Sequence, residues 1–209
     1  MSELTIWGRT NSINVQKVLW ACEDMNLPFQ RIDAGMEFGV NKTDEYKSKN
    51  PNGLVPTIND SGFILWESHS IMRYLTRKYD HQKTLYPDDL QICAKIDQWL
   101  DWYNTVGWPP MRALFWGWIR TPADQRNLKD LEATRQAFVQ TMSILDQALS
   151  NSPFIAGNVF TIADIPLALL CYRWYNLPIE RPVMQHLEAW YANVQNRPGF
   201  QKYSTEPLT

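Results

Sequence analysis

The sequence predicts two parts of different fold class: an α/β unit over residues 1–80 and an all-α helical bundle over residues 89–209. Two observations carry this prediction. The first part alternates between short strand-like and longer helix-like patterns of apolar residues, whereas the second shows helical periodicity only. Residues 81–88 (HQKTLYPD) form a polar linker between them, and a length of 209 residues suits two compact domains.

The first half of the α/β unit begins with a strand over residues 4–7, and from Val15 onward apolar residues recur at the spacing of a helix. A second strand is expected over residues 28–32, because proline is tolerated at the start of a strand. Residues 35–52 are polar and irregular. This half therefore predicts a strand, a helix, a strand and an irregular connection.

The second half of the α/β unit predicts a hairpin and a helix. Two short strands, over residues 57–58 and 63–66, flank the sequence Asn-Asp-Ser-Gly, which favours a turn. The helix that follows has one apolar face, formed by Ile71, Tyr74, Leu75 and Tyr79. The predicted order of the whole unit is β-α-β-(α)-β-β-α.

Everything after the linker predicts helices. The first covers residues 89–104, and Pro109-Pro110 must break or offset its continuation. A second covers residues 122–150, a third begins at Thr161, and a fourth follows it. The apolar stripes of the second and fourth helices are Leu128, Leu131, Phe138, Met142, Leu145 and Leu149, and Val183, Leu187, Trp190 and Val194.

Composition and charge exclude several classes of function. The formal net charge is −2 and no run of five like charges occurs, so no nucleic-acid partner is expected. No apolar run approaches the roughly 18 residues of a membrane span, and no signal peptide opens the chain, which predicts a cytoplasmic protein. The cysteines Cys22, Cys93 and Cys171 are odd in number and widely spaced, which favours buried free thiols over disulfides or a metal site.

Tryptophan is over-represented, with 10 residues, and several of them fall in one short stretch around the proline pair. Excess aromatic surface either fills a core or, beside a proline break, forms the wall of a ligand cleft. The composition leaves both interpretations open. The clustered residues are Trp99, Trp102, Trp108, Trp116 and Trp118.

The loop of residues 50–56 (NPNGLVP) is the first of three segments that suit a ligand. It ends in Val55-Pro56, just ahead of a strand, where a cis peptide bond is plausible. Such a bend would turn the backbone N–H and C=O groups of Val55 outward, so that an extended peptide pairs with them like an added strand. An ordinary turn is the alternative.

The other two segments lie where a strand gives way to a helix. Ser68 and the first N–H groups of its helix suit a carboxylate, and Glu67 suits an ammonium group, so together they fit an amino-acid head group. A plain helix cap with an acidic residue in the first turn is the alternative. At the first strand–helix junction, Ser12 is either a helix cap or a hydroxyl donor to an anion.

In this order and spacing, the three segments resemble those of a cytosolic glutathione transferase, most of all the bacterial theta-like members, and the resemblance covers nearly the full length. It implies a thioredoxin-like glutathione-binding domain followed by a helical domain that carries the electrophile site. It also implies that Val55 and a cis Pro56 pair with the cysteine of glutathione, and that Glu67 and Ser68 bind its γ-glutamyl end.

The resemblance further makes Ser12 the residue that holds the glutathione thiolate, because its spacing from Pro28 is that of the serine in theta-like enzymes. We expect Arg9 and Asn14 to help Ser12 or to take its place. Glutathione is then the co-substrate, and no metal is needed.

Two other features follow from the same resemblance. Theta-like members tend to offer a basic residue near the glycine end of glutathione, and this chain lacks it there, so Asn41 or Lys42 becomes the candidate. Residues 160–164 (FTIAD) resemble the helix-capping box of the helical domain, in which Thr161 and Asp164 each satisfy the backbone N–H of the other. We interpret this box as structural.

The thiolate is expected to attack an electrophilic carbon, a disulfide or a peroxide. The second substrate is expected between the end of the first strand and the helical segment around the proline pair, where Arg112 points to an anionic or halogen-bearing electrophile. The predicted electrophile-binding residues are Trp7, Trp108, Met111, Arg112, Phe115 and Trp116.

The resemblance also implies a homodimer. Two alternatives to a transferase stay open: a glutathione-dependent disulfide or peroxide reductase, which needs the same pocket, and a non-catalytic glutathione-binding module. Dithiol chemistry of the protein itself is not expected, because no cysteine starts the first helix and Cys22 lies on its apolar stripe.

Overall fold

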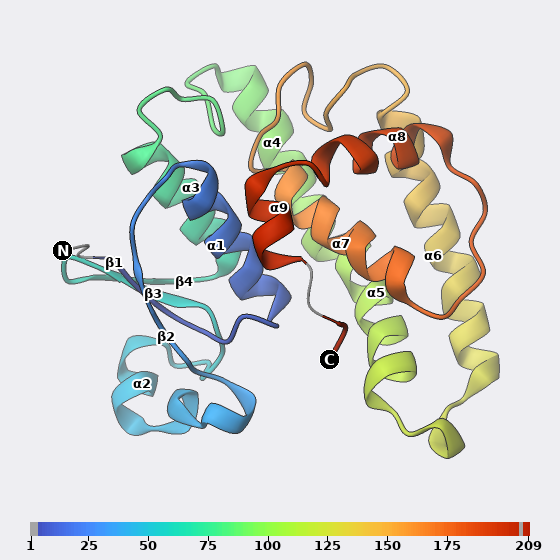
Figure 1. Ribbon diagram of the computed structural model, residues 1–209, viewed down its shortest axis with the longest axis horizontal. Helices are drawn as coiled ribbons and strands as arrows, with labels where there is room; N and C mark the ends of the chain where they lie inside the picture. The colour runs from blue at the N-terminus through green and yellow to red at the C-terminus, as the bar shows by residue number, and fades with distance from the viewer. Residues whose placement is uncertain (1–3, 205–206) are drawn as a thin grey trace. The chain divides into compact units, whose positions relative to one another are not determined.

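The structure, a computed structural model, describes residues 4–204 and 207–209. It consists of two compact units, traced in Figure 1. Unit 1 extends to Tyr86 and also contains the segment that starts at Pro198. Unit 2 begins at Pro87, continues to Arg197 and includes residues 207–209.

Within the described residues, a mixed sheet of four strands forms the centre of unit 1, in the order β2-β1-β3-β4 (Figure 1). β1 pairs in parallel with β2 and antiparallel with β3, which pairs antiparallel with β4. The strands are β1 (Leu4–Trp7), β2 (Gln30–Ile32), β3 (Thr57–Asp60) and β4 (Phe63–Trp66). The helices are α1 (Ile13–Asp24), α2 (Asp44–Lys49), α3 (Ser68–Tyr79) and α9 (Pro198–Tyr203). This arrangement confirms the predicted α/β, thioredoxin-like domain.

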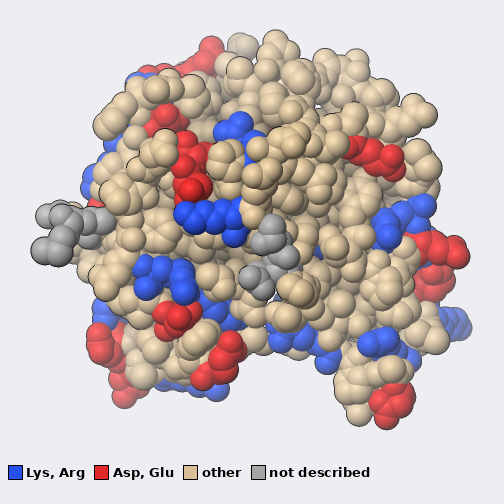
Figure 2. All heavy atoms as spheres, viewed as in Figure 1, with Lys and Arg blue, Asp and Glu red and all other residues tan. Residues whose placement is uncertain are grey.

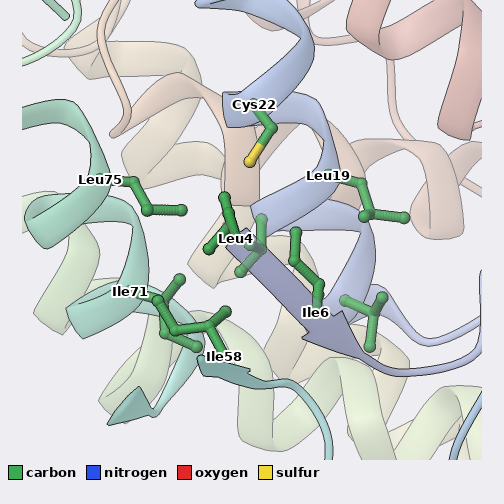
Figure 3. Packing of buried hydrophobic residues seen from close by; sticks show 9 residues of the cluster. Leu4, Ile6, Leu19, Cys22, Ile58, Ile71 and Leu75 are labelled. Atoms are coloured by element: carbon green, nitrogen blue, oxygen red, sulfur yellow. The ribbon is translucent and has the colours of Figure 1, made fainter. Parts of the chain in front are cut away.

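The core of unit 1 lies where β1 and β3 meet α1 and α3. Alternate residues of a strand point to the same face, so Leu4 and Ile6 of β1 are buried together with Ile58 of β3. The helices supply Val15, Val18, Leu19 and Cys22 from α1, and Ile71 and Leu75 from α3 (Figure 3). The helical spacing of these residues in the sequence therefore identified the face that α1 and α3 bury.

Some bounds in unit 1 differ from the prediction, and β2 begins at Gln30 and not at residue 28. β3 continues through Asp60, and the turn consists of Ser61 and Gly62, whose φ angles of 53° and 93° belong to the primed turns that favour hairpins. α2 takes the place of the bracketed helix in the predicted order, within the stretch whose residue pattern is irregular. Thr43 caps it, because the Thr43 hydroxyl accepts a hydrogen bond from the Tyr46 N–H at 3.2 Å.

Unit 2 is helical, as predicted. Its helices are α4 (Leu90–Trp102), α5 (Trp108–Phe115), α6 (Leu128–Ala148), α7 (Asp164–Asn176) and α8 (Gln185–Val194). A π-helical turn over Tyr103–Gly107 joins α4 to α5, and a second one over Trp116–Arg120 follows α5. Pro109 and Pro110 offset the helix without ending it, because they occupy the first turn of α5, where a proline is well tolerated.

The helix ends of unit 2 correct several expectations, and α7 begins at Asp164 and not at Thr161. α6 begins at Leu128 and not at residue 122, because the Asn127 side chain caps it by accepting a hydrogen bond from the Asp130 N–H. Leu128 is 60% exposed, and Val183, 76% exposed, precedes α8. Apolar residues at the ends of helices therefore extended the predicted stripes beyond the buried parts.

Asp164 ties three segments of unit 2 together. Its carboxylate accepts hydrogen bonds, each of 3.0 Å, from the backbone N–H groups of Ile155 and Thr161 and from the indole N–H of Trp190. The predicted box is thus half right, because the Thr161 hydroxyl accepts from the N–H of Ala163 and not from that of Asp164. Burial raises the pKa of Asp164 to about 6, against the effect of these hydrogen bonds.

The surface and the cysteines agree with the composition. On the face shown in Figure 2, acidic and basic side chains are interspersed. In the part of the chain that the structure describes, no helix is long and apolar enough to cross a membrane. Cys22, Cys93 and Cys171 are free and buried, as predicted, and the Cys22 sulfur lies in the core of unit 1 (Figure 3).

Candidate functional site

A cavity of about 60 Å³ lies in unit 1, lined from the start of α1, the loop before β3 and the junction between β4 and α3. Five lining residues are ones that the sequence singled out for glutathione: Asn14, Val55, Pro56, Glu67 and Ser68. The remaining lining residues are Asn50, Asn52, Leu54 and Trp66. All but Trp66 belong to the loop of residues 50–56, so the signal for them was in the same motif.

The loop before β3 has the backbone that the family resemblance implied, since the Val55-Pro56 peptide bond is cis. Gly53 has a φ of 61°, a left-handed conformation that glycine adopts readily. Asn41 donates a hydrogen bond from Nδ2 to the Gly53 carbonyl oxygen at 2.6 Å. Asn41 therefore supports this loop, while its contact with the glycine end of glutathione stays a prediction.

A hydrogen-bond network from α2 holds the same loop. The Tyr46 hydroxyl donates to the Leu54 carbonyl oxygen at 2.7 Å, and Asn50 donates from Nδ2 to the same oxygen at 2.9 Å. Asn50 also donates to the Thr57 hydroxyl at 3.0 Å, which lies 2.7 Å from the Tyr46 oxygen. Because the only hydroxyl proton of Tyr46 is directed to Leu54, Thr57 is the donor in that last pair.

Glu67 and Ser68 begin α3 in an unusual conformation. Glu67 has a φ of 72°, a region in which a side chain is strained by about 1–3 kcal/mol. Its carbonyl oxygen accepts a hydrogen bond from the Ile71 N–H, so Glu67 starts the helix through its main chain. Its side chain is exposed, whereas Ser68 is buried. Strained residues of this kind cluster at ligand-binding sites.

Ser12 is the residue before α1, and its side chain makes no capping hydrogen bond to the helix. Ser12 is therefore the N-cap residue by position, as one of the two interpretations had it, but its hydroxyl takes no part in the cap. Its carbonyl oxygen accepts from the Gln16 N–H at 2.8 Å, and the residue is 8% exposed. The hydroxyl thus stands at the positive end of the α1 dipole, close in sequence to the cavity residue Asn14.

Arg9 follows β1, and its N–H donates to the Ala34 carbonyl oxygen at 3.1 Å. A Cβ atom placed on Gly35 would stand 3.1 Å from Nη1 of Arg9 and 3.4 Å from a methyl group of Val55. Gly35 has a φ of 96°, so glycine permits both this backbone conformation and the close approach. The fold therefore brings the Arg9 guanidinium near Val55.

Two thiols of the protein are poor nucleophiles. Burial raises the pKa of Cys22, and the charge of Glu23 adds to this effect. Burial likewise raises the pKa of Cys171. Little thiolate is present at neutral pH when a thiol pKa is raised, so Cys22 at the first helix does not suit dithiol chemistry.

In unit 2, two of the predicted electrophile-binding residues lie against Arg173 of α7. The Arg173 guanidinium carbon is 4.0 Å from the ring centre of Phe115 and 5.5 Å from that of Trp108, distances typical of cation–π contacts. Arg173 itself is buried. The sequence did not single out Arg173, because it lies on α7, far along the chain from the tryptophan-rich stretch.

The other predicted electrophile-binding residues differ widely in exposure. Met111 is fully buried within unit 2, whereas Arg112 and Trp116 are exposed. Trp7, at the end of β1 in unit 1, is half-buried, and the Lys49 ammonium lies 5.8 Å from its ring centre. Their roles toward an electrophile stay predictions.

Two family models match the chain. The model for the glutathione S-transferase N-terminal domain matches residues 11–78, and the model for the C-terminal domain matches residues 111–207. The chain is also 35% identical to glutathione S-transferase GstB of Escherichia coli strain K12, over 99% of this chain and 100% of that protein. It is 26% identical to glutathione S-transferase 3 of Zea mays, over 97% of this chain and 93% of that protein.

Solved structures agree with these matches. The theta class glutathione S-transferase from the citrus canker pathogen Xanthomonas axonopodis pv. citri, with glutathione bound, superposes with a TM-score of 0.94 and 40% sequence identity. The match covers 100% of both chains. Poplar glutathione transferase F1 superposes with a TM-score of 0.83 and 25% identity, over 97% of each chain.

Proposed function

The chain belongs to the glutathione S-transferase family and is a glutathione S-transferase, and we propose that the cavity of unit 1 is its glutathione site. One observation carries this proposal: the cis Val55-Pro56 pair, Glu67 and Ser68 line the same cavity. In the proposal, the main chain of Val55 pairs with the cysteine of glutathione. Glu67 and Ser68 bind its γ-glutamyl end.

We assign the activation of the glutathione thiol to Ser12. A free thiol has a pKa near 8.5, and lowering it by about 2 units requires roughly 2.7 kcal/mol of preferential stabilisation of the thiolate. The start of a helix supplies about 0.3–1 kcal/mol, and a hydrogen bond from a hydroxyl to an anion adds about 1.5–3 kcal/mol. The Ser12 hydroxyl is suited to this role because it does not cap α1. The sum reaches the required value without a metal.

The reaction then proceeds by nucleophilic attack. The glutathione thiol loses its proton to solvent, and the thiolate sulfur forms a bond to an electrophilic carbon. The leaving group departs with the electron pair of the bond that breaks, giving a thioether. In the proposal, Arg9 and Asn14 assist Ser12 or take its place. The position of the Arg9 guanidinium near Val55 supports this role for Arg9.

Within unit 2, we place the electrophile-binding residues on α5, and the role of Trp7 in unit 1 stays a prediction. Phe115 and Trp108, held against the buried charge of Arg173, support this placement in unit 2. The exposed Arg112 makes an anionic or halogenated electrophile the favoured class. Met111 and Trp116 complete the proposed set of electrophile-binding residues.

We extend the proposal to a cytoplasmic homodimer. The free, buried cysteines support a reducing compartment, and the homodimer follows from the resemblance to cytosolic glutathione transferases. Analytical ultracentrifugation of the purified protein tests the oligomeric state. A monomer at micromolar concentration would contradict the dimer.

The experiment that tests the proposed function combines retention on immobilised glutathione with turnover of a neutral model electrophile. We expect both retention and glutathione-dependent turnover. Retention without turnover of the electrophile, a disulfide or a peroxide would identify a binding module. Turnover of a disulfide or a peroxide alone would identify the reductase. Failure to bind glutathione would contradict the assignment of the cavity.

A further inference from the structure

A buried lysine joins α1 to α3 behind the cavity of unit 1. Lys17 is only 1% exposed, and its ammonium group lies 2.9 Å from Oδ1 of Asn14 and 3.1 Å from Nε2 of His69. His69 follows Ser68 in α3 and is 4% exposed. The hydrogen-bonded chain therefore runs from a cavity-lining residue of α1 to the first turn of α3.

The chemistry of these groups fixes their orientation. An ammonium group only donates hydrogen bonds, so Asn14 must accept through Oδ1 and His69 through an unprotonated Nε2. The carboxamide of Asn14 cannot flip without placing its NH₂ group against the ammonium of Lys17. Its Nδ2 donor therefore remains for the cavity that Asn14 lines.

We infer that Lys17 and His69 position the Asn14 carboxamide so that Nδ2 donates to the γ-glutamyl α-carboxylate of glutathione, which gives Asn14 this role in place of assistance to Ser12 at the thiolate. Asn14 lines the cavity together with Ser68 and Glu67. In the inference, the α-carboxylate lies between the neutral donors of Asn14 and Ser68. The ammonium group of the γ-glutamyl residue then lies toward Glu67. The buried Lys17 charge, one hydrogen bond behind Asn14, favours an anion at this position. This inference rests on the proposed glutathione site, and it makes Lys17 and His69 positioning residues.

The test compares two ligands on the full-length protein: glutathione, and the analogue in which the γ-glutamyl α-carboxylate is a carboxamide. The ratio of their dissociation constants, measured by titration calorimetry, isolates recognition of this one carboxylate. For the unchanged protein we expect a preference for glutathione of about tenfold or more, the size of a hydrogen bond to a charged group. A merely structural role of Lys17 would leave this ratio unchanged.

Four variants decide the inference. Asn14→Asp keeps the shape but turns a second carboxylate toward the ligand, so it reverses the preference in favour of the carboxamide analogue. Lys17→Met lowers the preference at least roughly threefold, because it frees the amide to flip. His69→Gln retains an acceptor for Lys17 and most of the preference, whereas His69→Leu lowers the preference as Lys17→Met does.

Thr76→Val is the matched control, since Thr76 is a buried residue of α3 whose hydroxyl donates to the Met72 carbonyl oxygen at 2.7 Å. It loses stability but keeps the ligand preference. If Lys17→Met does not fold, the Asn14 and His69 variants decide the question alone. An unchanged ratio in all folded variants overturns the inference and leaves the glutathione site intact, whereas absence of glutathione binding to the unchanged protein overturns both.

Discussion

The hydroxyl group of Tyr46 in α2 donates a 2.7 Å hydrogen bond to the carbonyl oxygen of Leu54, in the loop that lines the proposed glutathione site. Tyr46 is buried, and burial raises its pKa against the hydrogen bonds from Thr57 and Asn50, so the hydroxyl keeps its proton and remains a donor. The loop of residues 50–56 is thus stabilised by a hydrogen bond from α2, a helix that does not line the cavity.

Replacing Tyr46 with Phe tests this support. We expect Tyr46→Phe to lower the free energy of unfolding by about 1–2 kcal/mol and to raise the dissociation constant of glutathione roughly threefold or more, because the loop is less pre-organised. Urea denaturation and calorimetry measure the two effects. Tyr79→Phe is the control, since that hydroxyl donates to Asp60 at 2.7 Å and does not line the cavity. Equal affinities for glutathione in both variants would contradict the role of Tyr46.

Asp60 gives a prediction about acid stability. Burial acts to raise its pKa, but hydrogen bonds from Lys78, Tyr79 and Tyr74 outweigh this and hold the pKa below its usual value. We expect Asp60→Asn to cost about 2 kcal/mol at neutral pH. A lowered pKa gives stability that is present above the unfolded-state value of about 3.9 and lost as the pH falls through the folded-state value. The difference in the free energy of unfolding between the unchanged protein and Asp60→Asn should therefore become smaller in acid. A difference that does not change with pH would contradict this account.

Asp164 should show the opposite pH dependence. Its pKa is raised to about 6 by burial, so the folded protein takes up a proton below this pH and gains stability until the unfolded state is also protonated near pH 3.9. Asp164→Asn keeps one acceptor oxygen and lacks this gain. We expect the free energy of unfolding of Asp164→Asn to be about 1–3 kcal/mol below that of the unchanged protein at neutral pH. This difference should grow as the pH falls from about 6 to about 4. Denaturation curves across this range check the sign.

The short motifs of the site were predictable because each is local in the sequence. Val55-Pro56 and Glu67-Ser68 mark places where a loop or a strand meets the next element, and the fold brings both to the same cavity. The buried Lys17 was not predictable, because it lies next to the apolar stripe of α1 and its partner His69 is distant in the chain. Such a pair becomes visible only when α1 and α3 pack together.

The misjudged elements have physical causes as well. α2 has one buried residue, Tyr46, among polar ones, so its periodicity is weak and the sequence predicted this helix only in brackets and without bounds. Leu128 and Val183 are apolar but exposed, at the first residue of α6 and before α8, and they therefore extended the predicted apolar stripes beyond the buried faces. The role of Arg173 beside Phe115 depends on a contact between α7 and α5, which periodicity does not encode.

Arg112 provides a prediction for the electrophile. If its exposed guanidinium attracts an anionic electrophile, Arg112→Ala should lower kcat/KM for an anionic electrophile, relative to a neutral one, by about threefold to fivefold. Arg135→Ala is the control, because Glu132 already holds that guanidinium at 2.6 Å. The same loss of rate on both electrophiles would remove Arg112 from the proposed site.

The central claim is that Ser12 stabilises the thiolate of bound glutathione. The most direct test is the ultraviolet absorbance of the thiolate in the protein–glutathione complex as a function of pH, for the unchanged protein and for Ser12→Ala. We predict that the bound thiol has a pKa about 2 units below its value near 8.5 in solution, and that Ser12→Ala restores most of this difference. A bound thiol that titrates as in solution, or an unchanged titration in Ser12→Ala, would contradict the claim.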